Sequence, residues 1–344
     1  MKPIRLAIIG GGVIGRRHAG AIAEDPTAEL VGVVDPALTG KVLAFDMGIP
    51  LYGDVQALFD AVSVDGVIVS TPTEHHCPPT LAALKAGAHV LVEKPIMPTI
   101  EQAEQVTAFS EEVKRHVMVG HHRRYYAQVH KTREIIQSGV LGQLVAVSGQ
   151  WTVRKNANYY DPNWRKNWEA GPILTNLIHE VDTLRYVCGE IASISAEISN
   201  GVMNFEKEDV AAMVMRFESG ALGTFVVSDR ATSPWAWEFS TGETPAFPKT
   251  GQNCVRFMGT KAALDFPNLA LWHHGDGAPD WNHAINPDEI PLELGNAYAR
   301  QISHFCAVIS GDEEPRITAR DATKTLRATL AVFDAAKSGK RVML

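Results

Sequence analysis

The sequence predicts an α/β protein of two domains, the first built on a parallel sheet and the second an α+β domain with an open, mostly antiparallel sheet. Up to about residue 120, short apolar runs alternate with helical patterns, as in a parallel sheet with helices on both faces. Beyond Gly142 the runs are longer, alternate between apolar and polar residues, and follow one another through short turns, which indicates antiparallel pairing. The 344 residues suffice for two domains, which we expect at 1–122 and 123–344.

The first half reads as strands that are each followed by a helix. In such a sheet a ligand binds beyond the carboxyl ends of the strands, so the residues at those ends are the candidates for function. The expected strands are Leu6–Ile9, Leu30–Val34, Gly66–Val69, Gly87–Val92 and Val117–Gly120, and the expected helices are Val13–Ala23, Thr80–Ala86 and Thr99–Val113.

Gly10, Gly12 and Gly15 follow the first strand with the spacing of a dinucleotide-binding turn. The first glycine permits the turn, the second lets a pyrophosphate approach the backbone, and the third lets helix and strand pack closely. The phosphates would then bind the amides at the start of the helix. These residues predict a Rossmann domain, and a glycine-rich turn without a ligand is the alternative.

Asp35 ends the second strand about twenty residues after the glycines, where a carboxylate accepts hydrogen bonds from ribose hydroxyls. Its charge would repel a 2′-phosphate, and residues 36–38 offer no arginine in exchange, so we expect NAD as the cofactor rather than NADP. The other residues expected to contact the cofactor are Val13, Ile14, Ser70, Thr71, Pro72, His76, Glu93 and Lys94.

Lys94 follows directly on a buried strand and precedes Pro95. Its ammonium would project over the nicotinamide, where partial burial lowers the pKa of a lysine and suits it to polarise a reacting oxygen. The proline holds Lys94 extended and allows a cis peptide bond. The alternative is a solvent-exposed lysine that has no role in catalysis.

In the second half, one helix carries a polar stripe. With helical spacing, Thr175, Asn176, His179 and Asp182 share one face between apolar neighbours, which is costly unless that face meets a polar cavity. His179 titrates near neutral pH and is a candidate proton acceptor, whereas a buried histidine satisfied by a carbonyl is the alternative. The expected helices of this half are Ile173–Val187, Ala297–Ile309 and Ala319–Ser338, and the strands are Leu144–Val153, Ala192–Val202, Val210–Phe217, Ala221–Ser228 and Cys254–Met258.

Four further side chains are candidates for binding substrate. Arg123 and Arg124 follow the last parallel strand and would bind hydroxyls or a carboxylate, with an interdomain salt bridge as the alternative. Trp164 and Arg165 lie in a loop, 159–171, that would form a lid, with Trp164 stacking on a sugar ring or simply packing. The aromatic segment 234–238 is expected to line the pocket or a subunit interface.

Several classes of function are disfavoured by composition. A net charge of −7 without a run of like charges argues against nucleic-acid and membrane partners. No apolar stretch approaches a membrane span and the N-terminus lacks the layout of a signal peptide, so we expect a cytoplasmic protein. The cysteines Cys77, Cys188, Cys254 and Cys306 are scattered and are expected to be free thiols. We expect no metal site, since His273, His274 and His283, near Asp276, Asp280 and Asp288, match no ligand motif.

A resemblance emerges from these motifs and their order. The sequence resembles the glucose–fructose oxidoreductase, inositol 2-dehydrogenase and MocA-like family. The residues that carry the resemblance are Gly10–Gly15 with His18, Thr71-Pro72 with His76, Glu93-Lys94-Pro95, Gly120–Arg124, Gly171–Leu174 with Asn176 and His179, and Ala319–Ala322 through Gly339-Lys340.

The resemblance implies an NAD-dependent dehydrogenase that oxidises a secondary hydroxyl of a sugar, polyol or sugar acid, with Lys94 beside that hydroxyl and His179 as acid/base. It also implies a homodimer or homotetramer formed through the C-terminal sheet. Many members carry an aspartate where this chain has Thr175, so Asn176 would orient the substrate beside a Lys94–His179 pair. The alternatives are a glycosidase that recycles its NAD internally and a non-catalytic NAD-binding sensor.

Overall fold

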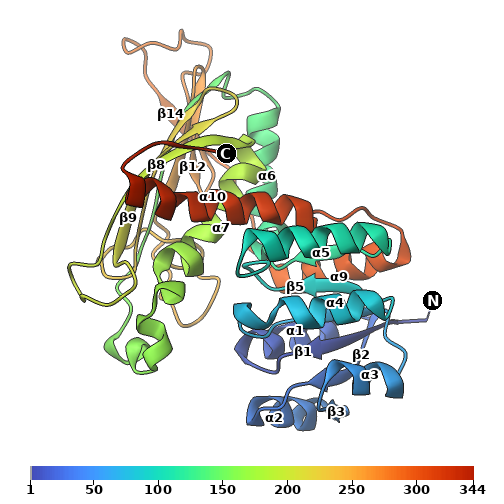
Figure 1. Ribbon diagram of the computed structural model, residues 1–344. Helices are drawn as coiled ribbons and strands as arrows, with labels where there is room; N and C mark the ends of the chain where they lie inside the picture. Colours follow the sequence, from blue (N-terminus) through green and yellow to red (C-terminus); the bar gives the residue numbers. More distant parts are fainter. Residues whose placement is uncertain (1) are drawn as a thin grey trace. The chain divides into compact units, whose positions relative to one another are not determined.

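The computed structural model describes residues 2–344, which form two compact units (Figure 1). The first unit contains the chain up to Tyr125 together with Asn296–Leu326, and the second contains Tyr126–Gly295 and Arg327–Leu344. This division differs from 1–122 and 123–344 because the chain returns to the first unit. The apolar face of α9 (Ala297–Ser310) packs there, and a Cβ on Gly66 would lie 2.7 Å from a side-chain carbon of Ile309.

The first unit is built on a six-stranded sheet in the order β3-β2-β1-β4-β5-β6, in which all the pairings are parallel. All five strands expected here are present, and the two-residue β3 is an addition. The strands are β1 (Ile4–Ile9), β2 (Ala28–Val34), β3 (Leu51–Tyr52), β4 (Gly66–Val69), β5 (His89–Val92) and β6 (Val117–Val119).

Helices cover both faces of this sheet. Right-handed crossovers from the central strand β1 carry α1 to one face, and the crossovers between β4, β5 and β6 carry α4 and α5 to the other. Accordingly α1 contacts α9, while α4 contacts α3 and α5. The helices are α1 (Val13–Glu24), α2 (Leu38–Met47), α3 (Val55–Ala61), α4 (Cys77–Lys85) and α5 (Ile100–Glu112), of which α2 and α3 were not expected.

The second unit is built on a nine-stranded sheet in the order β14-β13-β12-β11-β7-β10-β9-β8-β15. Its pairings are antiparallel except for β7 with β10, which confirms the expected open, mostly antiparallel sheet. The strands are β7 (Leu144–Thr152), β8 (Ile191–Ser199), β9 (Val210–Phe217), β10 (Leu222–Ser228), β11 (Val255–Gly259), β12 (Ala262–Phe266), β13 (Ala270–His273), β14 (Asn286–Glu289) and β15 (Val342–Met343).

The register of three central strands brings distant parts of the chain together at one end of these strands. Ser228, the last residue of β10, pairs with Thr152 at the end of β7 and with Val210 at the start of β9. Three segments therefore meet at this end of the strands: the two that follow β7 and β10 and the one that precedes β9. The candidate site of the second unit lies here.

The helix expected over 173–187 is present but begins irregularly. Residues Ile173–Leu177 form a π-helical turn, and α7 (Ile178–Cys188) continues from it. The regular helical spacing assumed for Thr175, Asn176 and His179 therefore does not apply across this turn. The other helices are α6 (Ala127–Gln137), α8 (Trp237–Thr241), α9 and α10 (Ala319–Ser338), and 3₁₀ turns occur at Thr73–His75, His122–Tyr125, Ala157–Tyr160, Asn163–Lys166 and Trp168–Ala170.

One face of the nine-stranded sheet is exposed. Along β9 and β10 buried residues alternate with exposed ones, and Val214, Leu222 and Val226 are 49%, 44% and 38% exposed. Aliphatic side chains thus stand on a face that this unit leaves open to solvent. None of the helices in residues 2–344 has the length and apolar character that a membrane span requires.

Candidate active site

The glycine turn between β1 and α1 is shaped by close backbone contacts. Gly10 has φ +102°, and a Cβ there would lie 2.7 Å from the backbone of Ser70. A Cβ on Gly15 would lie 2.0 Å from the carbonyl oxygen of Gly10. The Ser70 hydroxyl donates to that carbonyl at 2.8 Å, which ties the turn to the end of β4. Gly10 and Gly15 are therefore required by the fold itself.

Gly12 is different, because a Cβ there would meet no atom within 4 Å. Gly12 is also the N-cap of α1, whose first turn has no side-chain cap and no acidic residue, and Val13 beside it is 81% exposed. Open space thus lies next to helix amides that no side chain satisfies. These features fit the pyrophosphate of a dinucleotide, and Ile14 belongs to the same turn.

The carboxylate of Asp35 is fixed by the backbone around it. Oδ2 accepts from the N–H of Gly11 at 2.7 Å, and Oδ1 accepts from the N–H of Ala37 at 2.7 Å. The Thr39 hydroxyl donates to Oδ2 at 3.3 Å. The expected acceptor therefore stands at the end of β2 beside the glycine turn, with its orientation set before any ligand binds.

The loops that follow β4 and β5 are joined by His76, which is 1% exposed. Its Nε2 lies 3.0 Å from the carbonyl oxygen of Thr71, and its Nδ1 lies 2.9 Å from that of Pro95. Burial lowers the pKa of His76, and a neutral ring can donate to only one of these two carbonyl oxygens. His76 therefore lies buried between the two loops, and its predicted contact with the cofactor stays a prediction, as does that of Pro72.

Both carboxylate oxygens of Glu93 are likewise in contact with other groups of the protein. Its Oε1 lies 2.9 Å from Nε2 of His18, and its Oε2 accepts from the N–H of Lys94 at 3.1 Å. A Cβ on Gly120 would lie 2.7 Å from this carboxylate, so only a glycine fits opposite it. Burial opposes ionisation of Glu93, but the hydrogen bond and charge of His18 and the charges of Lys94 and His122 outweigh it and lower the pKa to about 2.

Lys94 is held from both sides by these contacts. Glu93 accepts from its N–H, Nδ1 of His76 lies 2.9 Å from the carbonyl oxygen of Pro95, and the Lys94–Pro95 peptide is cis, as the sequence allowed. The side chain is half-buried. Lys94 therefore starts from a rigid backbone at the carboxyl end of β5, in the same unit as the glycine turn and Asp35.

The two arginines after β6 are both buried. Arg124 Nη1 donates to Oδ2 of Asp321 at 2.6 Å and to the carbonyl oxygen of Arg316 at 3.3 Å, all within the first unit. The salt bridge of this residue therefore lies within the first unit rather than between domains, because residues 296–326 belong to the first unit. Arg123 is 2% exposed. The predicted contact of these two arginines with substrate stays a prediction.

In the second unit, the π-helical turn presents Thr175 and Asn176 half-buried and leads into His179, which is 8% exposed. The amide oxygen of Asn176 lies 2.8 Å from the Thr175 hydroxyl and 3.3 Å from Nζ of Lys155, both of which can donate to it. These contacts orient the amide so that its NH₂ group points away from both donors. Lys155, which follows β7, was not among the predicted site residues.

Glu208 supports the start of the π-helical turn. Its Oε1 accepts from the N–H of Ile173 at 2.8 Å, and a Cβ on Gly171 would lie 2.2 Å from its other carboxylate oxygen. Burial raises the pKa of Glu208 to about 7, although the Ile173 hydrogen bond and the charge of Lys207 oppose this. This role could not be predicted from the sequence, because a run of charged residues such as 206–209 is typical of a solvated loop.

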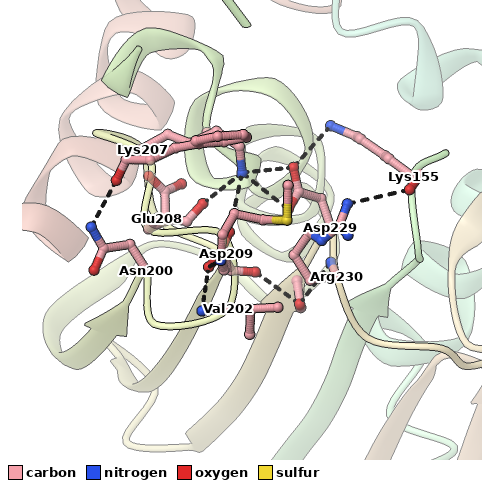
Figure 2. A network of polar contacts seen from close by, with 12 residues as sticks. Lys155, Asn200, Val202, Lys207, Glu208, Asp209, Asp229 and Arg230 are labelled. Carbon is pink, nitrogen blue, oxygen red and sulfur yellow. Dashed lines mark hydrogen bonds and ion pairs between the residues drawn. The ribbon is translucent and has the colours of Figure 1, made fainter. Parts of the chain in front are cut away.

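Behind Glu208 lies a buried group of charges (Figure 2). Lys207 is fully buried, and its Nζ donates to both carboxylate oxygens of Asp229, at 2.9 and 3.1 Å, and lies 3.7 Å from Asp209. Lys155 Nζ lies 3.6 Å from the same Asp229. A continuous polar chain thus connects the buried Lys207 to Asn176 through Asp229 and Lys155.

The segment expected to form a lid contains three 3₁₀ turns. Trp164 is 59% exposed, and the guanidinium of Arg165 lies 4.1 Å from the ring centroid of Tyr159 and 5.2 Å from that of Trp164. In the segment 234–238, by contrast, Trp237 is 1% exposed and packs against Tyr126 and Phe266. That tryptophan belongs to the core of the second unit.

The histidine and aspartate residues of 273–288 form separate pairs. His273 pairs with Asp288 and His283 with Asp280, each on the surface. Within residues 2–344 no group of three or more His, Cys, Asp or Glu side chains is arranged to hold a metal ion. All four cysteines are free thiols.

Comparison with known proteins identifies the family. A model described as an oxidoreductase family with an NAD-binding Rossmann fold matches residues 4–121, and the model of the GFO/IDH/MocA C-terminal domain matches residues 129–265. The chain belongs to the Gfo/Idh/MocA oxidoreductase family. The resemblance seen in the sequence is therefore confirmed, and with it an oxidoreductase with an NAD-binding domain.

Similar Gfo/Idh/MocA proteins align over almost the whole chain. It is 28% identical to 1,5-anhydro-D-fructose reductase of Ensifer adhaerens, over 98% of this chain and 97% of that protein. It is 26% identical to scyllo-inositol 2-dehydrogenase (NAD(+)) of Bacillus subtilis, over 99% and 96%. The WlbA dehydrogenase of Bordetella pertussis, solved with NADH and UDP-GlcNAcA, has the same fold, with a TM-score of 0.83 at 22% identity over 100% of this chain and 99% of that one.

Proposed function

We propose that this protein is an NAD-dependent dehydrogenase that oxidises a secondary hydroxyl of a sugar, polyol or sugar acid. The observation that carries the proposal is the fixed position of Lys94 at the carboxyl end of β5, beside a glycine turn with open space at Gly12. The named activities of the similar reductase and dehydrogenase support it.

The proposal assigns each part of the cofactor to residues of the first unit. The amides of Gly12 to Gly15 would hold the pyrophosphate and Asp35 the adenosine ribose, with Ser70 and Thr71 at the neighbouring strand end. Bound NAD would supply the acceptor for the hydride that leaves the substrate carbon. The charge of Asp35 favours NAD over NADP.

Lys94 and His179 act on one substrate hydroxyl in this proposal. His179 accepts the hydroxyl proton, and the Lys94 ammonium donates a hydrogen bond to the oxygen as negative charge develops on it. The NH₂ group of Asn176, oriented by Thr175 and Lys155, donates to a neighbouring substrate oxygen. Asn176 thus orients the substrate and leaves the proton transfer to His179.

A screen for reduced nicotinamide tests the proposal. The protein is mixed with NAD and a panel of pentoses, hexoses, inositols and sugar acids, and absorbance at the reduced-nicotinamide band is followed. Net reduction by at least one compound is expected. Release of an aglycone from glycosides without net reduction would instead support the NAD-recycling glycosidase, and tight NAD binding without any reaction would support the sensor.

We further propose that a second copy of the chain covers the exposed face of the nine-stranded sheet, giving a homodimer or homotetramer. Val214, Leu222 and Val226 on that face support this, because apolar side chains on an open sheet favour association. Light scattering on the wild type and on Val226→Glu tests it. The wild type is expected to be oligomeric and the variant to have a smaller mass, whereas a monomeric wild type would refute it.

A further inference from the structure

Lys155 offers a cation beside the residue that we assign to substrate orientation. Its Nζ lies 3.3 Å from Oδ1 of Asn176 and 3.6 Å from Asp229, and the side chain is 12% exposed. An ammonium has three N–H donors, so these two contacts leave one donor for a ligand. The residue is placed here because β7 and β10 end in register, and the N–H of Lys155 donates to the carbonyl oxygen of Asp229 at 3.0 Å.

Arg165 brings a second cation to the same place. Its guanidinium lies 4.1 Å from the centroid of the Tyr159 ring, and Nζ of Lys155 lies 4.4 Å from that centroid. Arg165 Nη1 donates to the carbonyl oxygen of Tyr159 at 2.9 Å, while its buried Nε has no hydrogen-bond partner among residues 2–344. The positive charges of Lys155 and Arg165 therefore both lie close to the Tyr159 ring.

The carboxylates nearby balance these charges only in part, because Lys155 shares its ion-pair partner Asp229 with Lys207. Asp229 is already bound by Lys207 through both oxygens, Asp209 accepts from the backbone N–H groups of Val202 and Met203, and Glu208 accepts from Ile173. Arg165 makes no ion pair with any carboxylate in the described part of the chain. In a protein with a net charge of −7, this local excess of positive charge favours an anionic ligand.

We propose that Lys155 and Arg165 form a carboxylate-binding subsite next to Asn176, so that the substrate is a sugar acid rather than a neutral sugar or polyol. The inference rests on the proposed dehydrogenase function and narrows its substrate class. The substrate carboxylate accepts from the free donor of Lys155 and from Arg165, while the NH₂ group of Asn176 binds an adjacent hydroxyl.

The test uses matched pairs that differ only in the carboxylate. Gluconate is compared with sorbitol, glucuronate with glucose, and galacturonate with galactose, each titrated calorimetrically into NAD-saturated protein at low ionic strength. We expect the acid of at least one pair to bind about tenfold or more tightly than its neutral partner, with an affinity that falls as salt is added.

Variants assign the effect to the two cations. Arg165→Gln is expected to weaken binding of the preferred acid about tenfold and to change binding of the neutral partner less than about twofold. Lys155→Gln is expected to weaken binding of the acid about tenfold and binding of the neutral partner by a smaller factor, because Lys155 also orients Asn176. Lys155→Arg should retain most of the preference. Lys166→Gln, which removes a lysine that donates to Asn163 in the same segment, is the matched control and should behave as wild type. Thermal unfolding and NAD affinity report whether each variant is folded.

Three results would overturn the inference: no acid binds better than its neutral partner, the Lys155 and Arg165 variants keep the preference, or they lose acids and neutral compounds equally. Oxidation of neutral sugars without any preference for acids would reject this subsite and leave the proposed dehydrogenase intact. Acids that bind selectively without reducing NAD would support this subsite and reject the proposed dehydrogenase.

Discussion

Nε2 of the buried His18 lies 2.9 Å from Oε1 of Glu93, the residue before Lys94. His18 lies on α1, which begins at the glycine turn, and Glu93 directly follows the last residue of β5. The pair therefore links the helix proposed to bind the pyrophosphate to the residue proposed to contact the substrate. Both ends of the proposed cofactor site are therefore joined by one buried side-chain contact.

Glu93→Gln should destabilise the protein near neutral pH by about 3 kcal/mol, because it removes one partner of a buried pair. The lowered pKa of Glu93 means that its contribution is present above pH 4.5 and is lost as the pH falls towards 2. The difference in free energy of unfolding between wild type and variant should thus shrink over that interval. Urea unfolding at several pH values measures it, with the exposed Glu112→Gln as control, and a difference independent of pH would contradict the ion pair.

Asp35→Asn should reduce the preference for NAD. The variant keeps the size of the side chain but removes the charge that repels a 2′-phosphate, so the ratio of kcat/KM with NAD to that with NADP should fall about tenfold or more. Asp46→Asn, at an exposed pair with Arg16, should leave the ratio unchanged. Comparable efficiency of the wild type with NADP would show that Asp35 does not select the cofactor.

Glu208→Gln should change how stability depends on pH. Since the pKa of Glu208 is raised from 4.5 to about 7, its protonated form is favoured in the folded state, and wild-type stability should fall as the pH rises through this range. The loss is on the order of 3 kcal/mol relative to the variant, which lacks the titrating group. Thermal unfolding from pH 4.5 to 8 measures it, and Glu206→Gln on the surface is the control. Parallel curves for wild type and Glu208→Gln would refute the assignment.

Local patterns predicted much of the first unit. The glycine spacing, Asp35 and Lys94 are all defined by a strand end and its adjacent turn, so a few neighbouring residues suffice to place them. The helix α2 was missed although Gly40 within it packs against Asp35, since a Cβ on Gly40 would lie 2.3 Å from the Cβ of Asp35. That contact depends on how the chain returns after β2.

The second unit was harder to predict because its site depends on register between distant strands. Lys155 and Asp229 are brought together by the parallel pairing of β7 with β10, and Lys207 joins them through the antiparallel pairing of β9 with β10. Sequence periodicity does not reveal either pairing. Similarly, the regular helix assumed over 173–187 concealed the π-helical turn that Glu208 supports. His179 could be proposed because a lone histidine on an apolar helix is visible locally, and its role stays a prediction.

The central claim is that Lys94 and His179 carry out the chemistry, and single-residue variants measured with an oxidised substrate test it most directly. Lys94→Ala and His179→Ala should each lower kcat by about 10²- to 10⁴-fold, because each removes a group that acts on the reacting oxygen or its proton. The dissociation constant for NAD, from fluorescence titration, should stay within about twofold, since neither side chain is assigned to hold the pyrophosphate or the adenosine ribose. Wild-type turnover by either variant would contradict the account.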